Sequence, residues 1–429
     1  MNFSIITFGC KVNQCESDNI RFSMIKNGYE LSENIQNSDI IIINSCTVTA
    51  ESDRKLRQTI NRIKKTNPSG IIVLTGCMPQ AFPEKAKKLL GIDIVIGNSE
   101  KHEMVSVLKN YLRNKVKIFE INNINNVFKF EKATFDSRLQ RSRAFLKIED
   151  GCDRFCSYCI IPYARGRVRS KNLEEIKKDI FNLSANGYKE IVLVGINLFS
   201  YGKDINSDIC EAVKVVAENP DIKRIRLGSL EPDLVSDEII EKLSCEKKLC
   251  PQFHLSLQSG SDKILKSMRR RYTSEEYLKL IKKLRDEFPD ATFTTDLMVG
   301  FPGETENDFE KSLEIIEKTE FLKVHVFPYS RRPGTLADKY LGQISKNVKT
   351  ERVKKAIEFS EKISKMVLSK FIGKTLDVLF ETKDENGFYE GYTSNYIYVK
   401  VKSDKDLIGN IERVELLKID KNFCIGMLH

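Results

Sequence analysis

The chain has 429 residues, of which 41% are hydrophobic, and no apolar run approaches the length that spans a membrane. This length exceeds what one core normally holds, so we expect two to four domains. The formal net charge of +10 permits a polyanionic partner. The chain has eleven cysteines, and its start, MNFSIITFGCKVNQ, lacks the features of an export signal. Together these features predict metal or cluster binding in a reducing, cytoplasmic location.

Residues 1–112 alternate short apolar runs with amphipathic segments, which predicts a small parallel α/β domain. We expect buried strands at 4–8, 39–43, 71–75 and 93–96. Cys10, Cys46 and Cys77 each follow such a strand within three residues, and ligands of open parallel sheets gather at the carboxyl ends of strands. One such cysteine could be a small buried apolar residue. Three in equivalent positions predict a shared cluster site.

Residues 113–140 are turn-rich and then polar and basic, which predicts a linker. In residues 141–338, six strand-like runs alternate with helical patterns and predict a partial (β/α)6 barrel, whose chemistry would lie in the loops at the carboxyl ends of its strands. Those loops are rich in Gly, Ser and Pro, which suits both a bound ligand and ordinary turns. The expected strands are 145–148, 191–194, 225–227, 253–257, 293–299 and 324–327.

The first of these loops, GCDRFCSYCIIPYARG, places Cys152, Cys156 and Cys159 in a Cys-x3-Cys-x2-Cys pattern. A cubane iron–sulfur cluster takes one thiolate per iron, so three thiolates leave the fourth iron open to a small molecule. Structural zinc normally closes with four ligands, usually from two Cys-x2-Cys knuckles, and this sequence has no second knuckle. We therefore expect a cluster at this loop.

Residues 339–370 have helical periodicity and carry nine Lys or Arg against three Asp or Glu, so we expect a basic helical connector. Five short strand-like runs in residues 371–429 predict a small OB-like β-barrel. Basic runs usually mark a solvated face, but several of them around one barrel favour a path for RNA. These runs are the connector, Arg138-Arg141-Arg143 and Arg165-Arg167-Arg169-Lys171.

The cysteine pattern, with Tyr158 before its last cysteine, resembles the signature of radical S-adenosylmethionine (SAM) enzymes, and the extension IIPYARG resembles their methylthiotransferase branch. The resemblance covers essentially the whole chain. It implies that the cluster at Cys152, Cys156 and Cys159 binds SAM and generates a radical from it. It also implies an auxiliary 4Fe-4S cluster on Cys10, Cys46 and Cys77, and it likens the C-terminal barrel to the RNA-binding TRAM domain. The resemblance further implies that SAM contacts Tyr158, Asn197, Ser229, Gln258 and Pro328, which are matched to the family through their positions after the expected strands.

These parts imply insertion of a methylthio group at C2 of N6-threonylcarbamoyladenosine beside the tRNA anticodon, with SAM as both radical source and methyl donor. The pieces GCKVNQ, CTVTAESDRKLRQ, CSYCIIPYARGR and GSLEP look most like this branch. The other branches act on N6-isopentenyladenosine or on an aspartate of a ribosomal protein. Arg331 and Arg332 follow the sixth strand, where they would recognise the carboxylate of the threonylcarbamoyl group or contact tRNA phosphate.

Such an enzyme also needs an electron donor of the flavodoxin or ferredoxin type and a source of sulfur. A different class of protein, a redox-sensing RNA-binding protein whose clusters report iron or oxygen, remains an alternative. A sensor of that kind needs no SAM pocket and forms no 5′-deoxyadenosine.

Overall fold

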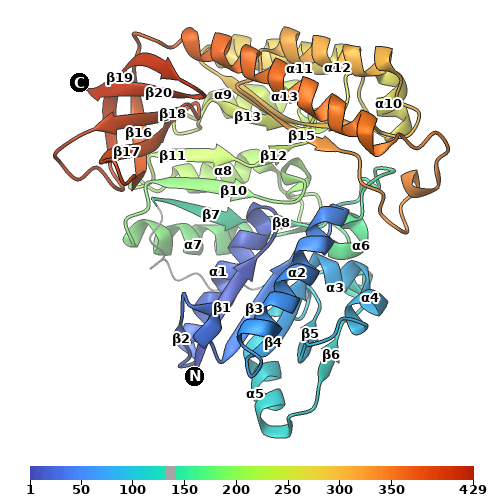
Figure 1. The fold of residues 1–429 in the computed structure, drawn as a ribbon. Coiled ribbons are helices and arrows are strands. Elements are labelled where there is room, and N and C mark those ends of the chain that lie inside the picture. The colour runs from blue at the N-terminus through green and yellow to red at the C-terminus, as the bar shows by residue number, and fades with distance from the viewer. Residues whose placement is uncertain (132–141) are drawn as a thin grey trace.

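The computed structural model describes residues 1–131 and 142–429 and shows the expected α/β architecture (Figure 1). In Figure 1 an N-terminal sheet with its helices lies below a central barrel of parallel strands. A small closed β-barrel at the C-terminus lies at the upper left. No helix within the described residues is long and apolar enough to cross a membrane.

The N-terminal part is a parallel sheet in the order β2-β1-β3-β4-β5-β6. Four of its strands match the expected apolar runs. The outer two, β2 and β6, have only two and three residues, too few to show a pattern in the sequence, and β6 lies within the stretch for which a linker was expected. The bounds are β1 Asn2–Thr7, β2 Glu30–Leu31, β3 Ile40–Ser45, β4 Ile71–Gly76, β5 Ile94–Ile96 and β6 Ile118–Glu120.

Helices cover both faces of this sheet, so its strands are buried on both sides. Helices α1 and α5 pack on one face through residues such as Ile20 and Leu108, and α2 to α4 pack on the other through residues such as Ile60 and Met78. The bounds are α1 Lys11–Lys26, α2 Ala50–Thr66, α3 Cys77–Ala81, α4 Pro83–Lys87 and α5 Met104–Asn114, with short 3-10 turns η1 Ile35–Asn37, η2 Lys101–Glu103 and η3 Ile124–Asn126.

The central barrel is open and consists of two parallel sheets, β11-β10-β7 and β12-β13-β14-β15, which meet where Ile225 bridges to Leu249. The six expected strands are present, and the third continues into the short β12. The strands are β7 Arg143–Lys147, β10 Glu190–Val194, β11 Arg224–Leu227, β12 Ser229–Leu230, β13 Gln252–Leu255, β14 Thr292–Val299 and β15 Lys323–Pro328. A small ladder pairs β8 Glu149–Asp150 with β9 Arg169–Ser170.

Helices wrap the outer face of the barrel, and one large core joins them to the strands. Their bounds are α7 Leu173–Ala185, α8 Ile209–Ala217, α9 Asp237–Ser244, α10 Asp262–Ser267, α11 Ser274–Glu287 and α12 Glu306–Thr319, with turns η4 Leu198–Ser200, η5 Pro232–Leu234 and η6 Ala337–Lys339. The short α6 Ile161–Arg165 packs instead against α3 of the N-terminal part.

The carboxyl edge of the N-terminal sheet faces this barrel. The first turn of α1, which follows β1, packs Val12 against Val192 and Val194 of β10. The loops after β3 and β5 also reach the barrel, where the Asn98 side chain donates to the carbonyl of Ala164 at 2.6 Å. The two parts therefore share a junction into which the loops after their strands converge.

Helix α13 (Lys346–Ser369) runs along the barrel from the loop after β15 toward the closed C-terminal barrel (Figure 1). It buries Ala356, Ile363 and Leu368 and leaves Lys362 and Lys365 exposed. The closed barrel has the strand order β16-β17-β18-β20-β19, as its five apolar runs predicted. Its strands are β16 Thr375–Lys383, β17 Phe388–Thr393, β18 Tyr398–Lys402, β19 Ile411–Asp420 and β20 Phe423–Leu428.

Candidate active site

The loop after β8 carries the three closely spaced cysteines. Gly151 has a φ of +90°, and a Cβ there would collide with the carbonyl of Arg167, so only glycine fits before Cys152. The Cys152 N–H donates to the carbonyl of Gly166 at 3.0 Å, which closes the loop. Burial raises the pKa of Cys152 to about 12. A thiol in this environment needs a cation beside it to become a thiolate.

One cation already faces this loop. Nη1 of Arg270 lies 3.4 Å from Sγ of Cys156, and another nitrogen of the same guanidinium pairs with Glu231. Glu231 belongs to the GSLEP loop, which also holds Arg154 at 3.4 Å. The loop after β11 thus fixes the charges around the cysteine loop, a role that the sequence pattern did not reveal.

Cys10, Cys46 and Cys77 lie together at the carboxyl edge of the N-terminal sheet. Cys10 immediately precedes α1, Cys46 follows β3, and Cys77 opens α3. Burial, and then the neighbouring sulfur of Cys77, raises the pKa of Cys46 to about 12. Gly76 has a φ of +101°, and a Cβ at this position would strike the backbone of Ser45. A glycine with positive φ precedes Cys10 as well.

Among the described residues, no three Cys, His, Asp or Glu side chains converge tightly enough to hold a single metal ion. A mononuclear zinc site would require such convergence. A cubane cluster binds each thiolate at a different corner, so its three sulfurs do not meet at one point. Two separate sets of three thiols, of which only Cys10 is exposed, therefore suit clusters rather than single ions.

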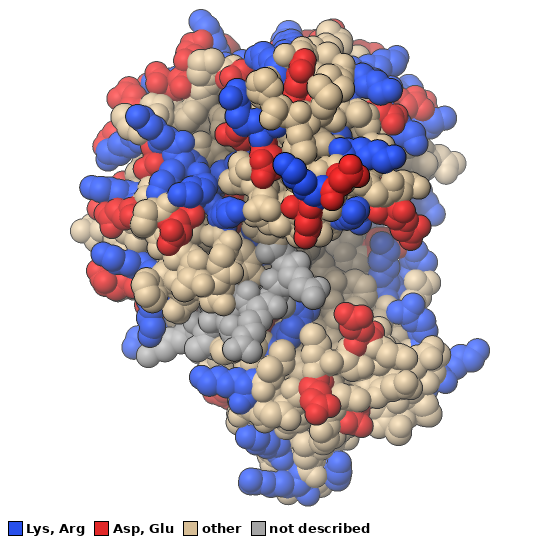
Figure 2. All heavy atoms as spheres, turned by 90° about the vertical axis from the view of Figure 1, so that its left-hand side faces the viewer, with Lys and Arg blue, Asp and Glu red and all other residues tan. Residues whose placement is uncertain are grey.

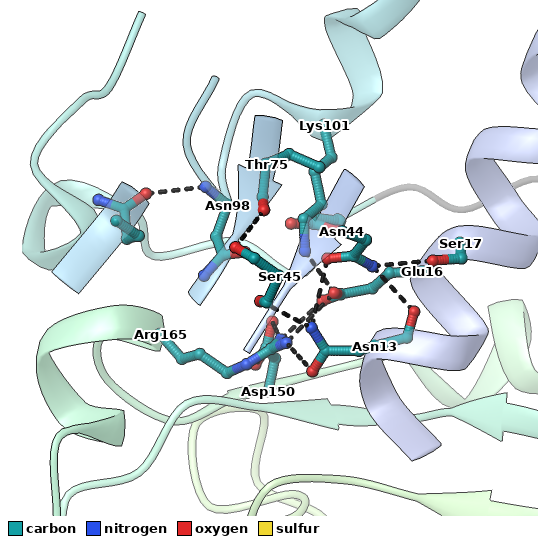
Figure 3. Close-up of polar contacts among 12 residues, drawn as sticks. Asn13, Glu16, Ser17, Asn44, Ser45, Thr75, Asn98, Lys101, Asp150 and Arg165 are labelled. Atoms are coloured by element: carbon teal, nitrogen blue, oxygen red, sulfur yellow. Dashed lines mark hydrogen bonds and ion pairs between the residues drawn. The ribbon is translucent and has the colours of Figure 1, made fainter. Parts of the chain in front are cut away.

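A buried network of charges spans the junction between the N-terminal part and the barrel (Figure 3). Glu16 on α1 accepts from Nη1 of Arg165 at 2.6 Å and from Nζ of Lys147 at 3.0 Å, and it also pairs with Lys101. Asp150 accepts from Lys147 at 2.8 Å and from Arg165 at 3.1 Å. Burial alone would raise the pKa of Glu16, but the three cations together hold it well below its ordinary value.

Arg165 occupies the centre of this network and is fully buried. It ends α6, the helix that directly follows the cysteines of the barrel loop. Its Nη2 donates to Oδ1 of Asn13 at 3.3 Å (Figure 3). The thiol of Cys10 donates to the same oxygen at 3.3 Å. One asparagine therefore connects this buried cation to Cys10, and Arg165 also lies within electrostatic reach of Cys77.

Comparison with known proteins identifies the family in which this arrangement occurs. A model of the radical SAM superfamily matches residues 146–316, and a model described as uncharacterized protein family UPF0004 matches residues 2–97. The threonylcarbamoyladenosine tRNA methylthiotransferase MtaB of Bacillus subtilis is 38% identical over 96% of this chain and 93% of its own length. The chain belongs to the radical SAM methylthiotransferases.

Other members of the family match the chain almost as well. The Thermotoga maritima protein with the same name is 40% identical over 92% of this chain and 89% of its own length. A tRNA-2-methylthio-N(6)-dimethylallyladenosine synthase of Caldicellulosiruptor saccharolyticus is 36% identical over 99% of this chain and 92% of its own length. These identities are too similar to separate the two substrate branches.

The fold also resembles that of solved radical SAM proteins. The radical SAM methyltransferase TsrM from Kitasatospora setae, solved with cobalamin and a [4Fe-4S] cluster, aligns with a TM-score of 0.59 at 13% identity. The alignment covers 78% of this chain and 76% of TsrM. At this identity the likeness concerns the fold alone.

Four of the five residues expected to contact SAM lie at or just beyond strands β10, β11, β13 and β15 in this methylthiotransferase, and Tyr158 lies in the cysteine loop. Both polar atoms of the Asn197 side chain are buried without a partner within the described part of the chain. Buried amides normally have partners, so this one suits a ligand. The other positions are Tyr158 against Phe301, Ser229 at 3.2 Å from the Ser256 hydroxyl, Gln258 after β13 and Pro328 at the end of β15. Their contacts with SAM stay a prediction.

The two arginines after β15 lie in different environments. Arg331 is exposed and donates from Nε to Asp338 at 2.8 Å. Arg332 is buried, and its Nη2 donates to Asp53 and to Thr47, both at 2.7 Å. Arg332 thus holds the N-terminal part against the barrel, which leaves Arg331 the freer of the two for a substrate. Substrate binding by Arg331 or Arg332 stays a prediction.

The basic run 165–171 does not form the surface path that the sequence suggested. Arg165, Arg169 and Lys171 are buried, and only Arg167 is exposed. Arg169 lies 3.4 Å from Asp150, and Lys171 pairs with Asp179. Arg143 is also largely buried and lies 3.1 Å from Glu381, while Arg138 and Arg141 lie outside the described residues. The run is therefore mostly structural.

The cysteines without a ligand assignment are accounted for by packing. Cys15 is buried, and its thiol donates to the carbonyl of Phe145 across the junction at 3.5 Å. Cys250 and Cys424 are buried in the barrel and the C-terminal domain, and Cys210 and Cys245 donate to carbonyls of nearby helices. Burial raises the pKa of Cys15 to about 12, so it is an unreactive thiol.

Proposed function

We propose that this chain inserts a methylthio group at C2 of N6-threonylcarbamoyladenosine in the anticodon loop of tRNA. The observation that carries this proposal is the pair of three-cysteine sites on opposite sides of one junction, in a chain whose relatives modify tRNA. One site would hold the cluster that binds SAM, and the other would hold the auxiliary cluster. Radical SAM chemistry supplies the 5′-deoxyadenosyl radical, and a second SAM supplies the methyl group.

The residues of this chain have distinct tasks in that reaction. Cys152, Cys156 and Cys159 would hold the SAM-binding cluster, and Arg270 places positive charge beside Cys156. Cys10, Cys46 and Cys77 would hold the auxiliary cluster, and Arg165 places positive charge near Cys10 through Asn13. Asn197, with its unpaired amide, would orient SAM at the end of β10. The junction between the two sites excludes bulk water, because its charged groups are buried.

The threonylcarbamoyl branch is favoured by the matching sequence pieces and by a cation at the substrate end of the barrel. A threonylcarbamoyl group carries a carboxylate and a hydroxyl, whereas an isopentenyl group is apolar. A site for the polar group needs a cation or several donors. Arg331 fits this need, because it is exposed at the end of β15 and only Asp338 binds its side chain among the described residues.

Mass spectrometry of tRNA nucleosides from cells that lack this protein tests the proposal. The 2-methylthio form of threonylcarbamoyladenosine should disappear, and that of isopentenyladenosine should persist. Loss of the isopentenyl product instead would assign the chain to the second branch, for which relatives of similar identity exist. If tRNA remained unchanged and the purified protein formed no 5′-deoxyadenosine from SAM and reductant, the redox sensor would be the better account. Assays of the purified protein with SAM and different electron donors and sulfur sources would identify these two components.

A further inference from the structure

Three aromatic side chains stand exposed around the cysteine loop of the barrel. Phe155 lies between Cys152 and Cys156 and is 46% exposed, Tyr163 on α6 is 47% exposed, and Phe128 after η3 is 72% exposed. The rings of Phe155 and Tyr163 meet edge to face with centroids 6.1 Å apart. Single exposed aromatic residues are ordinary, but a group of them beside a reactive loop indicates a binding surface.

Two of these rings line a pocket. Phe128 and Phe155 enclose it together with Asn125, Gly166 and Arg167, and its volume is about 520 Å³. Pockets that bind small organic groups measure roughly 300–1,000 Å³. Arg167 is exposed, and no carboxylate among the described residues pairs with it. The pocket thus offers an aromatic wall and a free cation.

The pocket is fixed rigidly to the cysteine loop. Gly166, which lines it, accepts the N–H of Cys152 at 3.0 Å, and the carbonyl of Arg167 accepts from Nη1 of Arg169 at 2.9 Å. Arg169 is itself anchored by Asp150 in the buried network. The wall of the pocket formed by Gly166 and Arg167 is therefore tied by hydrogen bonds to the loop that carries Cys152.

Phe155 adopts a backbone conformation that a bulky side chain rarely adopts. Its φ is +48°, in the left-handed region that glycine or asparagine normally occupies. A solvent-exposed phenylalanine in this conformation gains little from burial that would offset the strain. Strained residues of this kind cluster at ligand sites. The exposed position of the Phe155 ring therefore costs free energy of folding, which points to a ligand that contacts the ring.

We infer that this pocket binds an unpaired base of the tRNA anticodon loop, one that neighbours the adenosine to be modified. This inference rests on the proposed function. Aromatic faces stack on any base, and a cation beside the stack meets the phosphate that joins one nucleotide to the next. A base seated here orients the loop, so that the adjacent adenosine enters the barrel at the cysteine sites. Phe155 and Phe128 are positioning residues in this account.

Anticodon stem-loop RNA with 2-aminopurine beside the target adenosine tests the inference, because stacking quenches 2-aminopurine fluorescence. The protein is used as the full chain with both clusters assembled anaerobically. Wild-type protein should quench the probe. Phe155→Ala and Phe128→Ala should each weaken RNA binding by about tenfold and restore most of the fluorescence, while Phe155→Tyr should behave as wild type. Arg167→Ala should lower the salt dependence of binding by roughly 0.7 in slope.

Phe181→Ala is the matched control and should have no effect, because Phe181 on α7 is a phenylalanine about as exposed as Phe128 and more exposed than Phe155. Iron content is measured for each variant, and Phe128→Ala keeps the test decisive if Phe155→Ala loses a cluster. If wild-type protein failed to bind the RNA, the proposed function would fail. If it bound but the alanine variants kept full affinity and quenching, the inference alone would be overturned. Slower reduction by flavodoxin with unchanged RNA binding would overturn it too, in favour of an electron-donor surface.

Discussion

The two ends of the barrel hold buried charge in different ways. At the amino ends of the strands, Glu190 accepts from Nε of Arg226 at 2.9 Å, and the C-terminal barrel supplies carbonyls of Ser394 and Thr393 for the remaining donors of Arg226. At the carboxyl ends, the side chain of Asn197 and Oε1 of Glu149 are buried without partners among the described residues.

This difference separates a structural joint from a site built for ligands. At the amino end, no buried polar side-chain atom of Glu190 or Arg226 lacks a partner in the described part of the chain. These contacts therefore fix the C-terminal barrel and leave no polar atom of the pair for a ligand. The carboxyl end combines unpaired polar groups with two sets of thiols and a buried charge network. In this network the cations outnumber the carboxylates by one. The cations are Arg165, Lys101, Lys147 and Arg169, and the carboxylates are Glu16, Asp150 and Glu131. Excess buried positive charge there suits thiolate-bound clusters, which carry negative charge.

The largest expected effects come from removing one carboxylate at each end. Glu16→Gln and Glu190→Gln each leave buried cations without their partner, so each should lower the free energy of unfolding by about 3–5 kcal/mol. Only Glu16→Gln should also reduce the iron that the protein retains at Cys10, Cys46 and Cys77. Denaturant unfolding and iron analysis would measure the two quantities. Equal loss of iron in both variants would remove the distinction between the ends.

The pH dependence of the free energy of unfolding should show that Glu149, at the carboxyl end of the barrel, is buried without a cation among the described residues to pair with it. Burial raises the pKa of this carboxyl from 4.5 to about 8. Between these values the folded protein keeps a proton that the unfolded chain has lost, so stability should fall as the pH rises from about 5 to 8. Glu149→Gln should abolish this fall in denaturant titrations of the cluster-free protein. Glu16 stays ionised throughout the range, so an unchanged slope in Glu149→Gln would contradict the assignment.

A smaller effect contrasts two amides. Gln252 at the amino end accepts from Arg226 and donates to Thr294, so Gln252→Ala should cost about 1 kcal/mol of stability. The Asn197 side chain has no partner to lose within residues 1–131 and 142–429, so Asn197→Ala should leave the stability of the cluster-free protein unchanged or slightly higher. The same substitution should weaken SAM binding, which equilibrium dialysis of the loaded protein would measure. If Asn197→Ala destabilised the chain and bound SAM normally, this amide would be structural.

The sequence predicted those features that depend on local patterns. The apolar runs predicted the longer strands of the N-terminal sheet, of the central barrel and of the C-terminal barrel. The positions of Cys10, Cys46 and Cys77 just after strands predicted that these three cysteines would lie together. The glycines before Cys10, Cys77 and Cys152 were a further local signal, because each has a positive φ. Their regular position before a cysteine could have marked these loops as tightly constrained.

Features that depend on contacts between distant residues were not predictable. Glu16 and Arg165 are 149 positions apart, and no local pattern shows that one neutralises the other. The run 165–171 looks like a basic surface in the sequence, because a sequence does not distinguish an arginine paired in a junction from one in solvent. Arg332 is a similar case, since Asp53 and Thr47 lie in another part of the chain.

The central claim is that two separate cysteine sets each hold one cluster on either side of the junction, and iron analysis of two triple variants tests it most directly. After anaerobic reconstitution, alanine at Cys10, Cys46 and Cys77 should remove about half of the iron, and alanine at Cys152, Cys156 and Cys159 should remove about the other half. Circular dichroism would confirm that both variants are folded. A folded variant at Cys10, Cys46 and Cys77 that kept the full iron content would contradict the two-cluster account.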